Sequence, residues 1–275
     1  MILTNLSVVR DLCERHGLHP NKSLGQNFLI NPTVCPRIAE AGADAAKVAV
    51  EVGTGLGVLT KELSLRHERV ISFELDEKLR AVHEESLADC PNVEIIYADF
   101  LSADLHALLP PNTPLVFAAN LPYYVTTPII MKLLEGDTRF ESITVMAQRE
   151  AAERITSPPG TRTCGAISAA VAFYAECERL FAVGRGSFFP APNVDSTVIK
   201  LAPRTKPFEV DSKVYFKLVK SVFSERRKQA AGLIARDFAV SREQAQSLLK
   251  NPKARAENLT IEELVFISNE LCKLV

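Results

Sequence analysis

The stretch that decides the fold is residues 47–65, KVAVEVGTGLGVLTKELSL. Residues 47–53 form a short apolar, β-branched run typical of a buried strand, and residues 57–65 have the pattern of a helix start. Between them, Gly53, Gly55 and Gly57 stand at alternate positions. Glycine permits sharp turns and close approach of a ligand to the backbone, because it has no Cβ. The stretch therefore predicts a strand, a tight glycine turn and a helix.

Further apolar runs alternate with helical stretches after this point. Strands are predicted at residues 69–76, 93–99, 115–121 and 142–148, and helices at residues 77–88, 128–134 and 150–155. Continuous apolar strands separated by helices indicate a parallel sheet covered on both faces. A late pair, residues 177–184 and 194–202, lacks a helical spacer and is predicted to form an antiparallel hairpin at the sheet edge. The predicted fold class is α/β, with a Rossmann-like, doubly wound sheet.

The character of the chain changes after residue 202. A basic linker, residues 202–208, contains two prolines, and the residues beyond it have helical spacing. Helices are predicted at residues 215–224, 225–235, 242–250 and 261–273. We therefore expect two domains, an α/β domain at residues 1–204 and a small helical domain at residues 205–275.

The net charge of this 275-residue chain is −1, which hides an asymmetry. Residues 200–275 hold 15 Lys and Arg against 9 Asp and Glu, whereas residues 1–199 carry a net charge of −7. A locally basic end is compatible with a polyanionic partner such as nucleic acid.

The cysteines and the N-terminus indicate the cellular compartment. Six cysteines are scattered without a CxxC pair, which argues against a zinc ribbon or a disulfide framework and for reduced thiols. The histidines show no metal-ligand spacing. Charged residues interrupt the apolar N-terminus, so no secretory signal is expected, and the most apolar stretch, residues 166–175, is about half as long as a membrane span. We expect a soluble, cytoplasmic protein without a metal.

Carboxylates at successive strand ends indicate the type of cofactor. Glu74 lies 21 residues after Gly53, where it can accept hydrogen bonds from ribose hydroxyls, and Asp99 could accept from an adenine amine. For Asp99 alone, a solvated strand-end residue is an equally good interpretation. The glycine spacing is GxGxG and not the GxGxxG of dinucleotide folds. Glu51, just before the turn, would repel a diphosphate but suits a sulfonium or amino group. The set favours S-adenosylmethionine over NAD.

The segment Asn120-Leu121-Pro122-Tyr123 directly follows the fourth strand of the predicted sheet. The exocyclic nitrogen of adenine is a poor nucleophile, and two acceptors on its hydrogens can aim its lone pair at a methyl group. The Asn120 side-chain oxygen and the Leu121 carbonyl can supply that pair. Pro122 has no N–H and stiffens the turn, and Tyr123 offers a face on which an extruded base can stack.

A second aromatic candidate is Phe188, in the string Phe188-FPAPNVD-Ser196. Phe188 could cover the opposite face of a flipped base. The alternative, which composition alone favours, is that Phe188 and Phe189 fill the core beside the final hairpin.

With these residues identified, the chain resembles the ribosomal RNA adenine N6,N6-dimethyltransferases. The resemblance runs almost end to end and in family order. It rests on residues 23–29 (SLGQNFL), 51–60 (EVGTGLGVLT), 73–76 (FELD), 98–100 (ADF), 120–124 (NLPYY), 188–196 and 222–229 (VFSERRKQ). One departure is Thr54, where many relatives carry proline, and it puts nothing essential in doubt.

The resemblance implies roles for individual residues. It implies cofactor contacts from Asn27, Leu29, Gly53, Glu74, Asp99 and Asn120, to which the glycine turn adds Gly55 and Glu51. It implies that Asn120 and Leu121 orient the amine, and that Tyr123 and Phe188 stack on the base. Residues 222–229 are similar to the basic helix of the family's C-terminal domain, so Arg226, Arg227 and Lys228, together with Arg149 and Arg154, are expected to contact RNA. A solvated basic face is the alternative.

The resemblance also implies a reaction and a partner. The expected enzyme dimethylates two adjacent adenosines in the 3′-terminal hairpin of small-subunit ribosomal RNA, within a pre-30S-like particle, as a monomer and by direct methyl transfer without a metal. Three alternatives are the related class that dimethylates a large-subunit adenosine, a non-catalytic RNA-binding factor with the same fold, and a nicotinamide dehydrogenase. The intact segment at residues 120–123 argues against the second, and the glycine spacing argues against the third.

Overall fold

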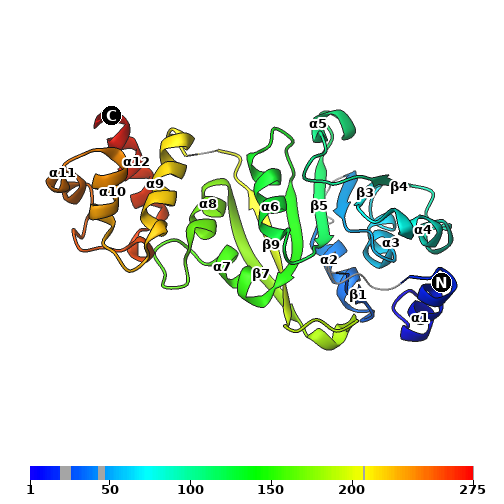
Figure 1. The fold of residues 1–275 in the computed structure, drawn as a ribbon. Coiled ribbons are helices and arrows are strands. Elements are labelled where there is room, and N and C mark those ends of the chain that lie inside the picture. The colour runs from blue at the N-terminus through cyan, green and yellow to red at the C-terminus, as the bar shows by residue number, and fades with distance from the viewer. Residues whose placement is uncertain (19–25, 43–46, 207, 275) are drawn as a thin grey trace. The chain divides into compact units, whose positions relative to one another are not determined.

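The computed structural model describes residues 1–18, 26–42, 47–206 and 208–274 (Figure 1). Its helices are α1 (Leu6–Arg15), α2 (Val34–Ala41), α3 (Val58–Ser64), α4 (Arg80–Ser86), α5 (Leu105–Leu108), α6 (Thr126–Glu135), α7 (Arg149–Thr156), α8 (Ala166–Tyr174), α9 (Ser212–Ser224), α10 (Ala230–Phe238), α11 (Arg242–Ser247) and α12 (Ile261–Leu274). Its strands are β1 (Phe28–Leu29), β2 (Val48–Val52), β3 (Arg69–Glu74), β4 (Val93–Tyr97), β5 (Leu115–Asn120), β6 (Ser142–Gln148), β7 (Ala175–Val183), β8 (Phe188–Phe189) and β9 (Ser196–Pro203). Short 3₁₀ turns are η2 (Glu77–Leu79), η3 (Arg185–Ser187) and η4 (Ala256–Asn258).

Seven strands form one sheet in the order β4-β3-β2-β5-β6-β9-β7. The strands from β4 to β6 are parallel, whereas β9 runs antiparallel to β6 and β7 is the edge strand next to β9. The buried runs of β2 and β5 explain why these two strands lie at the centre. The predicted α/β class with a Rossmann-like sheet is confirmed.

The strand order reverses between β2 and β5. From β2 the chain continues outward to β3 and β4, and it then crosses back to place β5 on the other side of β2. In open α/β sheets, ligands bind beyond the carboxyl ends of the strands at such a switch point. The fold therefore directs the search for a site to the residues that follow β2, β3, β4 and β5.

Contacts divide the chain into two compact units. The first comprises Met1–Ala152 and Glu178–Pro203, and the second comprises Glu153–Cys177 and the residues from Arg204 onward. The change from the first unit to the second between Pro203 and Arg204 lies one residue from the predicted domain boundary. Residues 153–177, however, belong to the second unit and not to the first, because the apolar helix α8 packs with the C-terminal helices.

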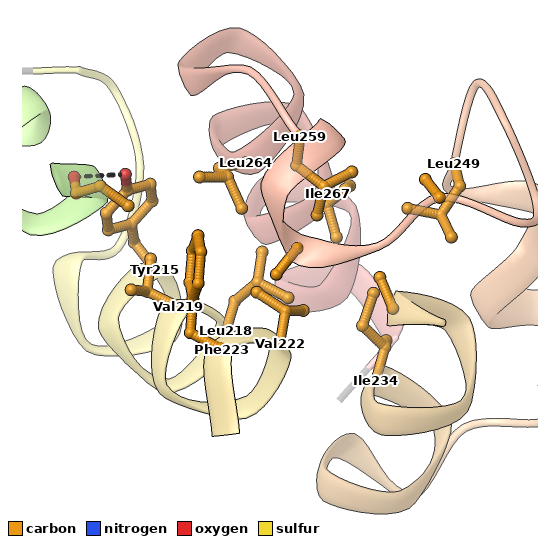
Figure 2. Packing of buried hydrophobic residues seen from close by; sticks show 14 of the residues in the cluster. Tyr215, Leu218, Val219, Val222, Phe223, Ile234, Leu249, Leu259, Leu264 and Ile267 are labelled. Carbon is orange, nitrogen blue, oxygen red and sulfur yellow. Dashed lines mark hydrogen bonds between the residues drawn. The ribbon is translucent and has the colours of Figure 1, made fainter. Parts of the chain in front are cut away.

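The core of the second unit shows this packing (Figure 2). Tyr215 on α9 is fully buried, and its hydroxyl donates a 2.9 Å hydrogen bond to the carbonyl of Ala169 on α8. The Phe173 ring of α8 lies 4.5 Å from the Tyr215 ring, centroid to centroid. Figure 2 shows Leu264 and Ile267 of α12 in the same cluster.

The basic segment at residues 225–229 is a turn, and its prediction as part of a helix is wrong. Helix α9 ends at Ser224 and α10 begins at Ala230. Glu225 has φ −135° and ψ 75°, outside the helical region. The Lys228 N–H then bonds to the Glu225 carbonyl at 2.8 Å, which closes the turn. Arg226, Arg227 and Lys228 therefore lie between two helices.

Within the described residues, no helix is both long enough and apolar enough to cross a bilayer.

Candidate active site

A cavity lies at the carboxyl ends of the central strands, where the strand order reverses. Its wall includes most of the predicted site residues: Asn27, Gly53, Gly55, Glu74, Asp99, Asn120, Leu121, Pro122, Tyr123 and Phe188. These residues come from the ends of β2, β3, β4 and β5 and from the short strand β8 and the residue before β1. The fold thus brings the glycine turn, the strand-end carboxylates and the segment after β5 into one site.

The glycine turn has a backbone that other residues rarely adopt. Gly53, Gly55 and Gly57 have φ angles of +81°, +57° and +88°, in the left-handed region that favours glycine. A Cβ on Gly57 would lie 2.8 Å from Leu87 Cδ2, too close to be accommodated without movement. A Cβ on Gly53 would lie 3.7 Å from the Asn120 carbonyl oxygen. The turn therefore passes directly beside the start of the segment after β5.

Glu74, at the end of β3, is held by backbone groups. Its Oε2 accepts from the Gly55 N–H at 3.0 Å, and its Oε1 accepts from the N–H groups of Leu75 and Asp76 at 2.8 and 3.0 Å. Burial raises the pKa of Glu74, and the three N–H donors oppose that rise. The arrangement holds a carboxyl group on the cavity wall in a fixed orientation.

Two predicted cofactor residues, Glu51 and Leu29, do not belong to the described cavity wall. Oε2 of Glu51 accepts from Thr60 Oγ1 and Ser72 Oγ, both at 2.7 Å, inside the core. Burial raises the pKa of Glu51 to about 8, which favours its protonated form. A role of Glu51 toward a cationic ligand stays a prediction. Leu29 is buried in the hydrophobic core.

The segment after β5 contributes four consecutive residues, Asn120 to Tyr123, to the cavity wall. Asn120 is the last residue of β5, paired with Met146 of β6, and the next residue, Leu121, is buried. The Tyr123 hydroxyl lies 3.1 Å from Oγ of Ser196, the buried first residue of β9. This contact anchors the Tyr123 ring at the cavity wall.

Phe188 is both a core residue and a wall residue. It lies on β8, which pairs antiparallel with β1, so that Phe188 is opposite Leu29 and Phe189 is opposite Phe28. Phe188 is buried in the core and also lines the cavity. Phe188 therefore fills the core, as composition indicates, and also lies where it could cover a base in the cavity. Its stacking role stays a prediction.

Several wall residues were not singled out as site residues from the sequence. They are Gln26, Phe28, Val52, Phe73, Leu75, Ala98, Phe100, Leu101, Tyr124, Val125 and Ile129. Most of them are sequence neighbours of a predicted site residue. They could have been found by including the residues on either side of each predicted one at the strand ends. Gln26 also donates to Asp76 Oδ2 at 3.0 Å. Ser23, Leu24 and Gly25, part of the N-terminal family segment, lie outside the described residues.

Comparison with known proteins identifies the family. A family model described as "Ribosomal RNA adenine dimethylase" matches residues 17–273. The chain belongs to this family. The predicted family is therefore confirmed, as is the prediction of a methyltransferase.

Relatives of this dimethylase-family chain match it over almost its whole length. "Ribosomal RNA small subunit methyltransferase A" of Bacillus cytotoxicus is 40% identical, with 95% of this chain and 94% of that protein covered. The protein of the same name from Shouchella clausii is 41% identical, with 94% and 92% covered.

Two solved structures share the fold. A dimethyladenosine transferase from Plasmodium falciparum has a TM-score of 0.75 at 23% identity, covering 89% of this chain and 97% of that one. The 23S rRNA methyltransferase ErmE has a TM-score of 0.71 at 28% identity, covering 90% and 100%.

The basic residues predicted to contact RNA differ in the ion pairs and hydrogen bonds that they form within the chain. In the first unit, Arg149 Nη1 lies 3.9 Å from Asp195 Oδ2. In the second, Arg226 donates to the carbonyls of Arg162 and Cys164 at 3.1 and 3.0 Å and lies 3.6 Å from Glu257. Lys228 pairs with Glu225 at 2.6 Å. Arg154 and Arg227 are exposed and form no ion pair with any residue that the structure describes. In this dimethylase-family chain, Arg226 is thus hydrogen-bonded to the loop that contains Arg162 and Cys164.

No group of three or more His, Cys, Asp or Glu side chains suited to a metal ion occurs in the described part of the chain.

Proposed function

We propose that this methyltransferase uses S-adenosylmethionine to dimethylate the N6 amines of two adjacent adenosines in the 3′-terminal hairpin of small-subunit ribosomal RNA. The observation that carries this proposal is the shared cavity, whose wall holds the glycine turn, Glu74 and Asn120 together. The names of the curated relatives support the small-subunit substrate.

The cavity suits an adenosine-containing methyl donor. The glycine turn leaves space that a Cβ would narrow, and Glu74 presents a buried carboxyl group to the wall. Glu74 would accept from the ribose hydroxyls and Asp99 from the adenine amine, and Asn27, Gly53 and Gly55 would line the remaining surface. S-adenosylmethionine supplies an electrophilic methyl group on a sulfonium when it is bound. Glu51 and Leu29 would support this surface from the core, as parts of β2 and β1.

The segment after β5 would orient the base. Oδ1 of Asn120 and the Leu121 carbonyl each accept one hydrogen bond from the N6 amine, so that its lone pair points toward the methyl donor. Pro122 has no N–H to compete for this position. The rings of Tyr123 and Phe188 would hold the extruded base by stacking. Catalysis then rests on positioning and on hydrogen bonding at the amine.

RNA would bind through cations that neutralise phosphates. Arg149, Arg154, Arg226, Arg227 and Lys228 are the proposed contacts, and of these Arg154 and Arg227 are exposed without an ion pair among the described residues. We propose that a pre-30S-like particle is the substrate, that the protein acts as a cytoplasmic monomer, and that it takes part in small-subunit biogenesis.

The test is a methylation assay with isotopically labelled S-adenosylmethionine and, separately, undermethylated small-subunit particles and large-subunit ribosomal RNA. Mass spectrometry of RNA fragments then reports the nucleoside and its position. The expected result is dimethyladenosine at two adjacent positions near the 3′ end of the small-subunit RNA. Label only in large-subunit RNA, or no label in either, would refute the proposal.

A further inference from the structure

A buried histidine lies directly behind the glycine turn. His83 is on α4, and only 4% of its surface is exposed. Its Nε2 lies 2.8 Å from the Gly55 carbonyl oxygen, and its Nδ1 lies 2.7 Å from the Tyr97 hydroxyl at the end of β4. The imidazole thus joins three segments that meet near the cavity.

These two contacts determine the tautomer of the ring. A carbonyl oxygen only accepts, so Nε2 must carry the hydrogen that it donates to Gly55. In a neutral ring Nδ1 is then an acceptor, and the Tyr97 hydroxyl donates to it. Burial lowers the pKa of His83, which favours the neutral ring. Tyr97 therefore keeps the hydrogen of His83 on the nitrogen that faces Gly55.

Gly55 is consequently held on both sides. Its N–H donates to Glu74 Oε2 at 3.0 Å, and its carbonyl accepts from His83. Its φ of +57° lies in the left-handed region that glycine adopts readily, so the two hydrogen bonds select this conformation from the several that a glycine can reach. Gly55 lines the cavity, whereas His83 and Tyr97 line a separate shallow hollow with Arg80 and Glu84. The direct hydrogen bond from His83 to a wall residue is therefore the one to the Gly55 carbonyl.

We propose that His83 is a positioning residue for the methyl donor, which fixes the Gly55 peptide in its binding conformation, with Tyr97 selecting the required tautomer. This proposal rests on the proposed function of the cavity as the S-adenosylmethionine site. Because the hydrogen bond from His83 already orders the glycine turn, less conformational entropy is lost when the ligand binds.

The test compares His83→Leu, which removes the donor, with His83→Gln, whose side-chain amide N–H replaces Nε2–H. Calorimetric titration of the full chain with S-adenosylmethionine should show affinity about 3- to 10-fold weaker for His83→Leu, as expected for one lost hydrogen bond. His83→Gln should stay within about 2-fold of the original protein. Tyr97→Phe, which retains the ring, should show a smaller loss than His83→Leu. In the methylation assay, KM for S-adenosylmethionine should rise while kcat changes little.

Two results would overturn the proposal. One is unchanged affinity in both His83→Leu and Tyr97→Phe. The other is equal weakening by His83→Gln and His83→Leu with a matching loss of thermal stability, which would make His83 a packing residue only. Failure of the original protein to bind S-adenosylmethionine is a distinct outcome, because it would refute the proposed cofactor before any variant is compared.

Discussion

The hydroxyl of Tyr123 lies 3.1 Å from Oγ of Ser196, which joins the segment after β5 to the first residue of β9. Ser196 is fully buried and Tyr123 lines the cavity. The hydrogen bond restricts rotation of a ring that we propose to stack on the target base. The pairing of β9 with β6 fixes the position of Ser196 and, through this hydrogen bond, the orientation of the Tyr123 ring in the candidate active site.

The first prediction concerns this anchor. Ser196→Ala and Tyr123→Phe each remove the hydrogen bond but retain the Tyr123 ring face. We expect kcat for RNA methylation to fall about 2- to 10-fold in either variant, since one hydrogen bond contributes about 0.5–1.5 kcal/mol. The affinity for S-adenosylmethionine, measured by titration, should not change. An unchanged kcat in both variants would show that the anchor does not matter for the reaction.

Glu74 provides a second prediction. Glu74→Ala removes a buried acceptor from the proposed ribose site, and binding of S-adenosylmethionine should weaken by about 1–3 kcal/mol. Glu77→Ala is a matched control, because Glu77 is an exposed carboxylate nearby on η2 that pairs only loosely with Arg80 at 3.9 Å. Titration calorimetry measures both. Equal affinity of the Glu74 variant and the control variant would show that Glu74 does not bind the ligand.

Glu51 gives a prediction on pH and stability. Burial raises the pKa of folded Glu51 to about 8, against 4.5 for the unperturbed group. Between these values the folded state binds more protons than the unfolded state, so this group makes stability fall as pH rises. Glu51→Gln removes the titration and keeps an acceptor for Thr60 and Ser72. Relative to the original protein, the variant should therefore gain about 3–4 kcal/mol of unfolding free energy from pH 5 to pH 8.5.

Urea unfolding at the two pH values measures this difference. Other titrating groups are common to both proteins and cancel in the comparison. A stability difference that is the same at both pH values, or that favours the original protein at pH 8.5, would show that Glu51 is ionised in the folded state.

The basic turn provides a fourth prediction, which separates binding from folding. Arg227→Ala should weaken RNA binding and reduce the salt slope by about one phosphate contact, without changing Tm. Arg226→Ala should lower Tm, because Arg226 holds the carbonyls of Arg162 and Cys164. Filter binding over a range of salt concentrations and thermal unfolding measure the two effects. A lowered Tm for Arg227→Ala with an unchanged salt slope would assign Arg227 a structural role.

Local patterns in the sequence predict most of the sheet and the cavity. The strand ends that carry Gly53, Glu74, Asp99 and Asn120 follow apolar runs, and a doubly wound sheet brings such ends together. These predictions succeed because they depend on hydrophobic periodicity and on one general rule of topology.

Features that depend on distant parts of the chain could not be predicted in this way. The pairing of Phe28 with Phe189 joins segments from opposite ends of the first unit. The orientation of Glu51 depends on Ser72 and Thr60 in other elements, and both faces of β2 are buried, so alternation does not identify its partners. Residues 225–229 have good helix formers, yet the chain turns there and Arg226 bonds to a separate loop. In each case tertiary contacts outweigh the local pattern.

The central claim is that Asn120 orients the adenine amine, and single-turnover methyl transfer tests it most directly. Asn120→Ala, saturated with labelled S-adenosylmethionine and small-subunit particles, should transfer methyl groups about 100- to 1000-fold more slowly, as for loss of one preorganised group at a reacting centre. Its affinity for the RNA particle should be unchanged. A single-turnover rate within 2-fold of the original protein, with RNA binding intact, would contradict the account.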